Sequence, residues 1–335
     1  MKKIALVLFS IITLTAFAQS PKSVQFTPSN YYSLFSATTK PVLTIQPGDT
    51  IHTSSVDCNG FDLNGIKKAV GAEGADSGNP LTGPFYVEGA EEGDIVQVTF
   101  VDIQFSRNTA FCFPYFHDRS MPAAITSLAK NTSTPIIWDL DIKNHKASIH
   151  NKTAHLVNFD VAIRPFLGCV GLAAPKGQKV STEDAGPFGG NMDFTRITKS
   201  ASVYLPVYNQ GGLLYLGDGH AAQGDGEINW TALETSLNFS FVVKLIKHPK
   251  VQISYPRIED AEYIMTAGIS ATLDSALQIA TTGIFEWLQE TYHLTVEEAT
   301  QVMGSSLEYK IAEIVDPQVE IIAMIKKSAL RKIKP

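Results

Sequence analysis

The densest group of chemically capable side chains lies in the stretch GDGHAAQGDGE, from Gly217 to Glu227. Four glycines separate an imidazole, an amide and three carboxylates: His220, Gln223, Asp218, Asp225 and Glu227. Because glycine adopts positive φ readily, we expect a loop that presents these groups from the end of a strand. Imidazole nitrogen and carboxylate oxygen are good ligands for zinc and other divalent first-row metals, and three protein ligands would leave a position for water. The alternative is an ordinary tight turn, because the stretch lacks the spacing of a metal signature such as H-E-x-x-H.

Two further stretches carry polar groups that could take part in chemistry. Asn191 and Asp193 follow a glycine turn, with Glu183 and Asp184 before it, and could ligate a cation or orient a substrate amide. By itself this pattern is more typical of a polar turn. In the stretch Thr53–Cys58, a strand end carries the carboxylate of Asp57 and a thiol.

Other chemistries have less support. A nucleophilic Cys58 would need a nearby base, and no spacing identifies one. The chain has no G-x-S-x-G elbow, which argues against an α/β-hydrolase triad. The glycines between 217 and 226 are not followed by the lysine of a phosphate-binding loop.

These side chains must be positioned mainly by strands, because alternating apolar and polar residues dominate the chain. A turn at Pro47-Gly48-Asp49 divides residues 41–55 into two strands and predicts a hairpin. Further strands are expected at 94–105, 136–142, 202–208, 213–216 and 237–245. Residues 107–147, rich in aromatic residues and interrupted by prolines, are expected to be irregular outside the strand at 136–142.

Helices are expected only near the C-terminus. Leu273, Leu277, Ile284 and Leu288 fall on one helical face behind a cap at Thr272. A capping box at residues 295–298 opens a second helix. The chain is therefore expected to be mainly β with an α+β portion, in which strand-rich sandwich or barrel-like subdomains (24–250) precede a helix-containing part (251–335).

Composition limits the possible partners. The 335 residues are 44% hydrophobic and 18% charged, enough apolar material for a large packed core. With 27 Lys and Arg against 33 Asp and Glu, the net charge is −6, so no basic surface for nucleic acid is expected.

The first residues resemble an export signal. Two lysines precede an apolar run that ends at the small-x-small triplet 16–18, so we expect cleavage after a signal peptide at 1–18 and a soluble periplasmic or secreted product without a membrane anchor. Cys58, Cys112 and Cys169 allow at most one intramolecular disulfide.

Several stretches together resemble the acetamidase/formamidase family of amide hydrolases. They are PVLTIQPGDT (41–50), NPLTGPFYVEGAEEGDIVQV (79–98), GCVGLAAP (168–175), GPFGGNMDFTRI (186–197) and SVYLPVYNQGGLLYLGDGHAAQGDGE (202–227). They recur in order across residues 19–335, although residues 105–135 fit the family pattern poorly. The resemblance implies a mainly β homo-oligomer, a dimer or larger, that hydrolyses small linear amides to a carboxylate and ammonia. It also implies a divalent cation, with zinc the first candidate and calcium a second one elsewhere.

A competent site must activate water, stabilise an oxyanion and protonate the departing nitrogen. We hypothesise that the metal ligands come from His220, Asp57, Asp193 and Asp225, that water is activated by the metal, and that Glu227 moves the proton. Asn191 or Gln223 would bind the amide, and backbone N–H groups of glycine turns such as Gly190 would complete the oxyanion site. The alternative from another class is an exported binding protein that keeps the amidase scaffold without catalysis.

Overall fold

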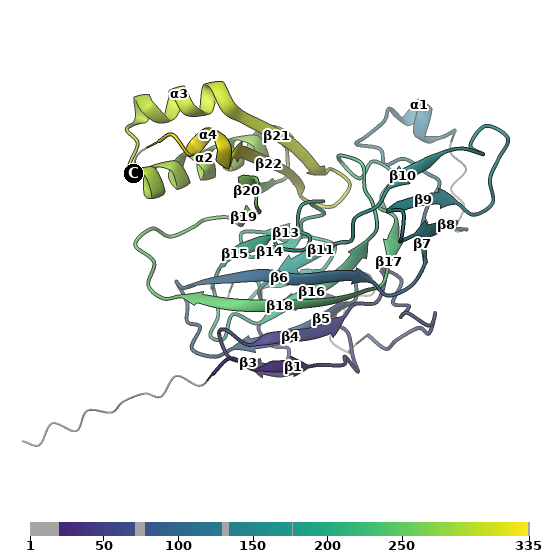
Figure 1. Ribbon diagram of the computed structural model, residues 1–335, viewed down its shortest axis with the longest axis horizontal. Coiled ribbons are helices and arrows are strands. Elements are labelled where there is room, and N and C mark those ends of the chain that lie inside the picture. Colours follow the sequence, from purple (N-terminus) through teal and green to yellow (C-terminus); the bar gives the residue numbers. More distant parts are fainter. Residues whose placement is uncertain (1–19, 71–77, 129–133, 176, 334–335) are drawn as a thin grey trace, which may run out of the picture.

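Two large β-sheets build the protein, shown in Figure 1 as a computed structural model that describes residues 20–70, 78–128, 134–175 and 177–333. Within these residues, one sheet has nine strands, in the order β1 (Ser23–Gln25), β4 (Thr50–Ser54), β18 (Leu237–Ile246), β6 (Ile95–Phe105), β15 (Ser202–Pro206), β19 (Arg257–Glu259), β20 (Tyr263–Ser270), β22 (Val319–Lys326) and β21 (Leu307–Glu313). The proposed signal peptide falls outside the described residues.

The second sheet contains the strands that will matter for the site. Its order is β10 (Asp160–Ala162), β9 (Lys146–Ile149), β8 (Ile136–Asp141), β7 (Thr109–Cys112), β17 (Glu234–Thr235), β16 (Leu214–His220), β11 (Phe166–Gly171), β14 (Gly189–Asn191) and β13 (Ala185–Gly186). Strand β5 (Leu81–Val87) pairs with β16 and with β3 (Leu43–Ile45), while β2 (Leu34–Ser36) and β12 (Lys179–Ser181) form a separate pair.

The main core lies between the two sheets. Val98 and Phe100 of β6 are fully buried and belong to the same apolar cluster as Leu167 of β11. Phe241 of β18 contacts Phe85 of β5 across the interface, with ring centroids 5.4 Å apart. The sandwich predicted from period-two alternation is therefore confirmed, because the apolar side of each strand faces the other sheet.

The expected hairpin at residues 41–55 is wrong in its pairing. The two strands exist as β3 and β4, and the turn between them is closed by a hydrogen bond from Asp49 N to Gln46 O (3.0 Å). However, β3 pairs with β5, whereas β4 pairs with β1 and β18, so the turn carries the chain from one sheet to the other. Turn chemistry alone could not show that the strands diverge.

The two longer helices lie where the sequence predicts them, whereas the short α1 (Ala123–Thr126) lies in the region expected to be irregular. Helix α2 (Leu273–Tyr292) starts at its cap Thr272, and α3 (Val296–Ser306) starts with the capping box of Thr295 and Glu298. The predicted apolar face of α2 is half right. Ile284 and Leu288 are buried together with Ala276 and Ala280, whereas Leu273 and Leu277 are each 41% exposed.

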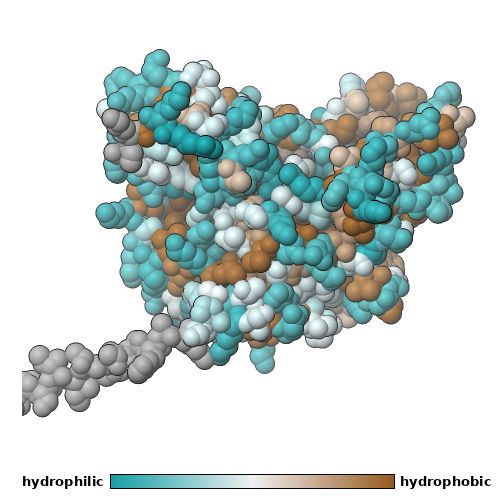
Figure 2. Space-filling view, viewed as in Figure 1, coloured by the Kyte–Doolittle hydropathy of each residue, from teal (hydrophilic) through white to brown (hydrophobic). Residues whose placement is uncertain are grey.

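Two lobes rise from the sandwich in Figure 1. One contains α2, α3 and the short α4 (Lys327–Leu330) over β20–β22; the other contains β7–β10 and the short α1 (Ala123–Thr126). Figure 2 shows a hollow between the lobes and brown, hydrophobic side chains on the second lobe. Among the described residues, no helix combines the length and apolar character needed to span a bilayer.

Candidate functional site

His220 is the last residue of strand β16, and Asp218 lies two residues before it. Residues two apart on a strand point to the same side, and both side chains line one cavity. The predicted ligand-presenting loop is therefore partly a strand, because β16 continues through Gly217–His220. The glycines before and after Asp218 allow close packing: a Cβ on Gly219 would stand 2.6 Å from Thr235 O, and one on Gly217 would stand 2.7 Å from Leu81.

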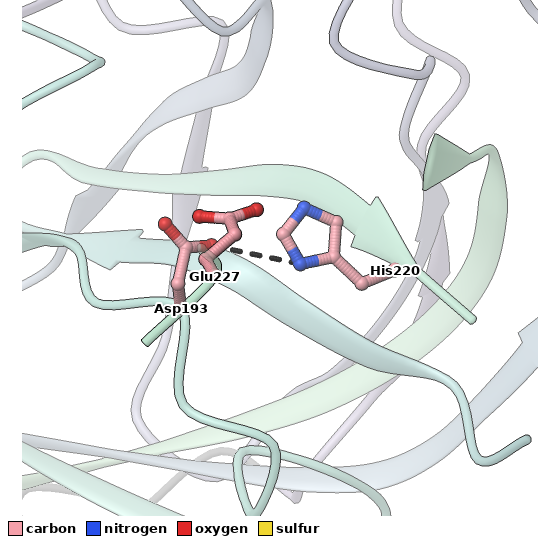
Figure 3. Close-up of side chains that lie close together, drawn as sticks. All are labelled: Asp193, His220 and Glu227. Atoms are coloured by element: carbon pink, nitrogen blue, oxygen red, sulfur yellow. Dashed lines mark ion pairs between the residues drawn. The ribbon is translucent and has the colours of Figure 1, made fainter. Parts of the chain in front are cut away.

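His220 is almost completely buried among acidic groups. Its Nε2 lies 3.2 Å from Glu234 Oε1 and 3.4 Å from Asp218 Oδ1, and its Nδ1 lies 3.5 Å from Asp193 Oδ1. Figure 3 shows the ion pair of Asp193 with the ring and the carboxylate of Glu227 beside Asp193. Burial disfavours the imidazolium, but the charges of Glu234 and Asp218 outweigh burial and raise the pKa of His220 well above its usual range.

Gln223 determines which ring nitrogen of His220 is free. Its Nε2 donates to the backbone oxygens of Asp193 (2.7 Å) and Ala312 (3.1 Å), so its Oε1 faces His220 Nδ1 at 3.1 Å. A flipped amide would place an oxygen against two carbonyl oxygens, so Oε1 must accept a hydrogen bond from Nδ1–H. The lone pair of the neutral imidazole is therefore at Nε2, on the side of Asp218 and Glu234.

The donor set on this side fits a divalent cation. Asp218, His220 and Glu234 each offer a ligand atom, and these atoms lie within 4.8 Å of one another. Among the residues that the structure describes, Asp218 Oδ1 and Glu234 Oε2 on this side, and Asp193 Oδ1 on the Nδ1 side, are buried without a hydrogen-bond partner. Unpartnered buried carboxylate oxygens are costly, and a cation would satisfy them. Asp193, His220 and Glu227 form a second such set, but on the Nδ1 side that Gln223 already uses.

Behind the histidine, an amide holds two further acids. Asn191 Nδ2 donates to Asp193 Oδ2 (2.7 Å) and to Asp316 Oδ2. Asn191 Oδ1 accepts from the Cys169 thiol (2.7 Å) and from Asn79 Nδ2 (3.1 Å), and Asn79 also donates to Asp218 Oδ2 (3.1 Å). The amide of Asn191 is thus used within the protein, and it positions acids in place of the substrate contact that we predicted.

Burial raises the pKa of several acids of the site. Burial, together with the charge of Asp193, raises the pKa of Glu227 well above its usual range despite the opposing effect of His220. Burial likewise raises the pKa of Asp193 well above normal, and it raises the pKa of Asp316 to about 7 against the lowering effect of Asn191. A carboxyl group with a raised pKa is suited to take up a proton and pass it on, as a general acid–base group must.

Three acids of the site have backbone conformations that residues other than glycine rarely adopt. The φ angles of Asp193, Asp218 and Glu227 are 40°, 57° and 48°. Such conformations cost free energy and concentrate at functional sites. Their grouping around one histidine supports a functional role for the cluster.

The cluster opens into a cavity of about 710 Å³. His220, Asp218, Glu234, Asp193 and Glu227 all line it, as do Asn79, Asn191, Cys58 and Asp316. A small solute can therefore reach the acids although their side chains are nearly fully buried.

Two predicted metal ligands are not brought into the cluster. Asp57 Oδ2 pairs with Arg107 at 2.7 Å, and its Oδ1 accepts from the backbone N–H groups of Asn59 and Phe61. Asp225 is exposed and pairs with Lys310 at 3.0 Å. We therefore replace both as ligands, since Asp57 is already neutralised by a guanidinium and Asp225 faces solvent.

Gly190 is engaged in the sheet. It pairs with Val170 of β11 and with Ala185 of β13, in a backbone conformation (φ 124°) that favours glycine. A Cβ there would stand 2.5 Å from Asp184 O, so the close approach of β13 explains this glycine.

Several residues of the site had no role assigned to them from the sequence. Asp218 would have followed from extending the strand to His220, because alternate residues share a face. Glu234 lies opposite His220 in the register of β16 and β17, and only strand pairing reveals it. Asn79 and Asp316 come from distant parts of the chain with no local signal.

Known proteins resemble this chain over most of its length. The model of the acetamidase/formamidase family matches residues 29–184 and 175–325. A formamidase from Methylophilus methylotrophus is 27% identical over 337 residues, covering 81% of this chain and 82% of the relative. An acetamidase from Mycolicibacterium smegmatis is 42% identical over 60 residues, covering 18% of this chain and 15% of the relative.

Solved structures show the same fold. A predicted acetamidase/formamidase from Thermoanaerobacter tengcongensis superposes with a TM-score of 0.77 and 25% identity, covering 94% of this chain and 99% of that one. An acetamidase from Yersinia enterocolitica gives a TM-score of 0.76 and 26% identity, covering 94% of each chain. The resemblance seen in the sequence is confirmed, and the chain belongs to the acetamidase/formamidase family.

Proposed function

We propose that the protein is an amidase that hydrolyses the C–N bond of small linear amides to a carboxylate and ammonia. The observation that carries this proposal is the convergence of His220 Nε2 with unpartnered oxygens of Asp218 and Glu234 at a cavity that also exposes the protonatable Glu227. Family membership supports the reaction class, because the named relatives are formamidases and acetamidases.

Asp218, His220 and Glu234 would hold the divalent cation, with zinc as the first candidate. An imidazole ligand disfavours calcium at this position, since calcium prefers an all-oxygen shell. When bound, the cation would act as a Lewis acid that lowers the pKa of water, so that a hydroxide nucleophile is available near neutral pH.

The chain's own residues supply the remaining functions. Gln223 keeps Nδ1 of His220 protonated and so directs Nε2 to Asp218 and Glu234. Hydrolysis forms a C–O bond and breaks the C–N bond, so the nitrogen needs a proton before it leaves as ammonia. Glu227 can accept the proton that the attacking water loses and deliver it to this nitrogen, because it lines the cavity beside Asp193.

A cysteine mechanism is disfavoured. Burial raises the pKa of the Cys58 thiol well above its usual range, and the negative charges of Glu234 and Asp218 raise it further. A nucleophilic cysteine requires the opposite shift. We therefore do not expect thiol alkylation to reveal a catalytic role for Cys58.

The proposal extends to assembly and location. The second lobe exposes large apolar side chains, including Leu128 (75%) and Val157 (51%), which would be covered in a homo-oligomer. Export would follow from the signal-like residues 1–18. Light scattering of the purified protein and fractionation of cells test these two statements.

The activity is tested by incubating the protein with formamide, acetamide and propionamide and measuring ammonia. We expect release that stops on chelation and returns when zinc is added. Turnover that ignores exhaustive metal removal would contradict the cation's role. Silence across all amides in metal-loaded protein would favour the alternative of an exported binding protein.

A further inference from the structure

The cavity has a second wall, made of aromatic side chains. Phe113, Tyr115 and Trp230 line the same cavity as the acids. Phe113 and Tyr115 are stacked with centroids 5.8 Å apart, and Tyr115 meets Trp230 edge to face at 6.1 Å. Phe113 and Tyr115 follow strand β7, within residues 105–135, which fit the family pattern poorly.

The aromatic wall is tied directly to the acidic groups. Trp230 N donates to Glu227 O at 2.8 Å, so one tight turn carries both the wall and the proposed proton carrier. Tyr115 and Cys58 line the same cavity, and the Cys58 thiol donates to Glu234. A molecule whose reacting group reaches Glu227 and Glu234 would therefore place its remainder against these rings.

Trp230 is held at the cavity at a cost. It is 51% exposed, and its φ of 69° is unusual for a bulky residue. Exposed aromatic surface that lines a cavity is ready to be covered by an apolar ligand. The turn that holds Glu227 thus also fixes a large, uncovered ring.

The charges around the wall favour a neutral ligand. Among the described residues that line the cavity, Arg119 and Lys67 are the long basic side chains. Arg119 donates to the backbone oxygens of Ile314 (3.1 Å), Asp316 and Pro317 (3.3 Å), and Lys67 lies over the Phe61 ring at 5.7 Å. Arg119 is thus engaged with carbonyls, which argues against an acyl group that carries its own carboxylate.

We propose that the preferred substrates are primary amides whose neutral acyl part carries an aromatic ring, as in benzamide or phenylacetamide. This inference rests on the proposed amidase function. Water adds to the carbonyl carbon, the C–N bond breaks, and the products are the aryl carboxylate and ammonia. A cavity of about 710 Å³ exceeds what acetamide needs and lies within the range of pockets that hold larger ligands.

The test compares benzamide with acetamide in the metal-loaded protein. We expect kcat/KM to be about 100-fold higher for benzamide, because each methylene-sized apolar group that a hydrophobic pocket accommodates raises kcat/KM at least about ten-fold. Trp230→Ala lowers the ratio of the benzamide to the acetamide kcat/KM about ten-fold, and Trp230→Phe restores most of this ratio. Phe116→Ala is the matched control, since this exposed neighbour of Tyr115 does not line the cavity.

Calorimetry separates this inference from the proposed function. Benzamide binding that weakens in Trp230→Ala, with no ammonia from any amide, would support the ligand class and contradict the amidase. Acetamide turnover equal to or better than benzamide turnover would overturn the substrate class and leave the amidase intact. Equal loss for both amides in Trp230→Ala would also overturn it, because the tryptophan would then act only through the fold.

Discussion

Oε1 of Gln223 lies 3.1 Å from Nδ1 of His220, while the nitrogen of the same amide donates to two backbone carbonyls. This arrangement fixes the tautomer of the imidazole and leaves Nε2 to face Asp218 and Glu234. The carboxylates that raise the pKa of His220 would equally attract a cation when Nε2 loses its proton.

Replacing Gln223 by leucine should weaken metal binding without removing a ligand. The imidazole would lose the acceptor that holds Nδ1–H, and losing the hydrogen bond that orients a metal-binding histidine typically costs about 10–100-fold in affinity. Competition with a chromogenic chelator measures the change. Gln252→Leu is the control, because Gln252 also bonds a backbone carbonyl but lies at the surface. Unchanged affinity in Gln223→Leu would show that Gln223 does not direct Nε2 of His220 to the metal.

Neutralising individual acids should separate metal binding from proton transfer. Asp218→Asn is expected to lower the zinc content of the purified protein strongly, since it replaces a negatively charged carboxylate ligand by a neutral amide. Glu227→Gln should keep zinc but reduce kcat at least about 100-fold, the usual contribution of a general acid or base.

Metal content by mass spectrometry and ammonia release are measured on the same samples. Asp225→Asn is the control, because its carboxylate pairs with Lys310 in solvent. Loss of zinc in Glu227→Gln, with zinc retained in Asp218→Asn, would place the cation on the other side of His220.

Gly168 should tolerate no side chain. A Cβ there would clash with Asp193 Oδ1 and stand 2.5 Å from Asp218 Oδ2 and 3.0 Å from His220 Cε1. Gly168→Ala is therefore expected to displace the acids, lowering zinc affinity and kcat by at least about ten-fold, with a modest loss of thermal stability. Gly304→Ala serves as the control, since nothing surrounds that position. Activity equal to the wild type in Gly168→Ala would contradict the described packing.

Glu320 should make stability depend on pH. Its carboxyl group is fully buried with no partner for either oxygen, and burial with the nearby charge of Glu313 raises its pKa well above normal. From about pH 4.5 upward the folded state keeps a proton that the unfolded chain has lost, so the free energy of unfolding falls as the pH rises. The contribution of Glu320 to this free energy is therefore fully present only at acid pH. It is lost at about 1.4 kcal/mol per pH unit as the pH rises toward the raised pKa.

Glu320→Gln removes this titration. Urea unfolding across pH 5–9 should therefore show a flatter dependence in the variant, which becomes more stable than the wild type at alkaline pH. Glu92→Gln, at an exposed position, is the control. Parallel curves for Glu320→Gln and the wild type would show that Glu320 is not the group responsible.

Local patterns predicted the parts of the fold that depend on local physics. Alternation in β6 and β18 identified half-buried strands, and Thr272 and Thr295 identified helix starts, because these signals depend on neighbours in sequence. The partners of β3 and β4 could not be predicted, since they depend on contacts with β5 and β18.

The same division holds for the site. His220 and Glu227 stood out because unusual residue types gathered in one stretch, and both line the cavity. Asp57 and Asp225 were chosen as nearby carboxylates, but Arg107 and Lys310 engage them. Glu234 replaces them because it lies opposite His220 on the neighbouring strand, a relationship that only the sheet creates.

The central claim is that the buried group around His220 hydrolyses amides. Its most direct test is ammonia release by His220→Ala, with zinc supplied and the folded state verified by an unfolding temperature close to that of the wild type. We predict that the wild type releases ammonia from benzamide or acetamide and that the variant is at least about 1,000-fold slower with both. Release by folded His220→Ala at the wild-type rate would contradict the account.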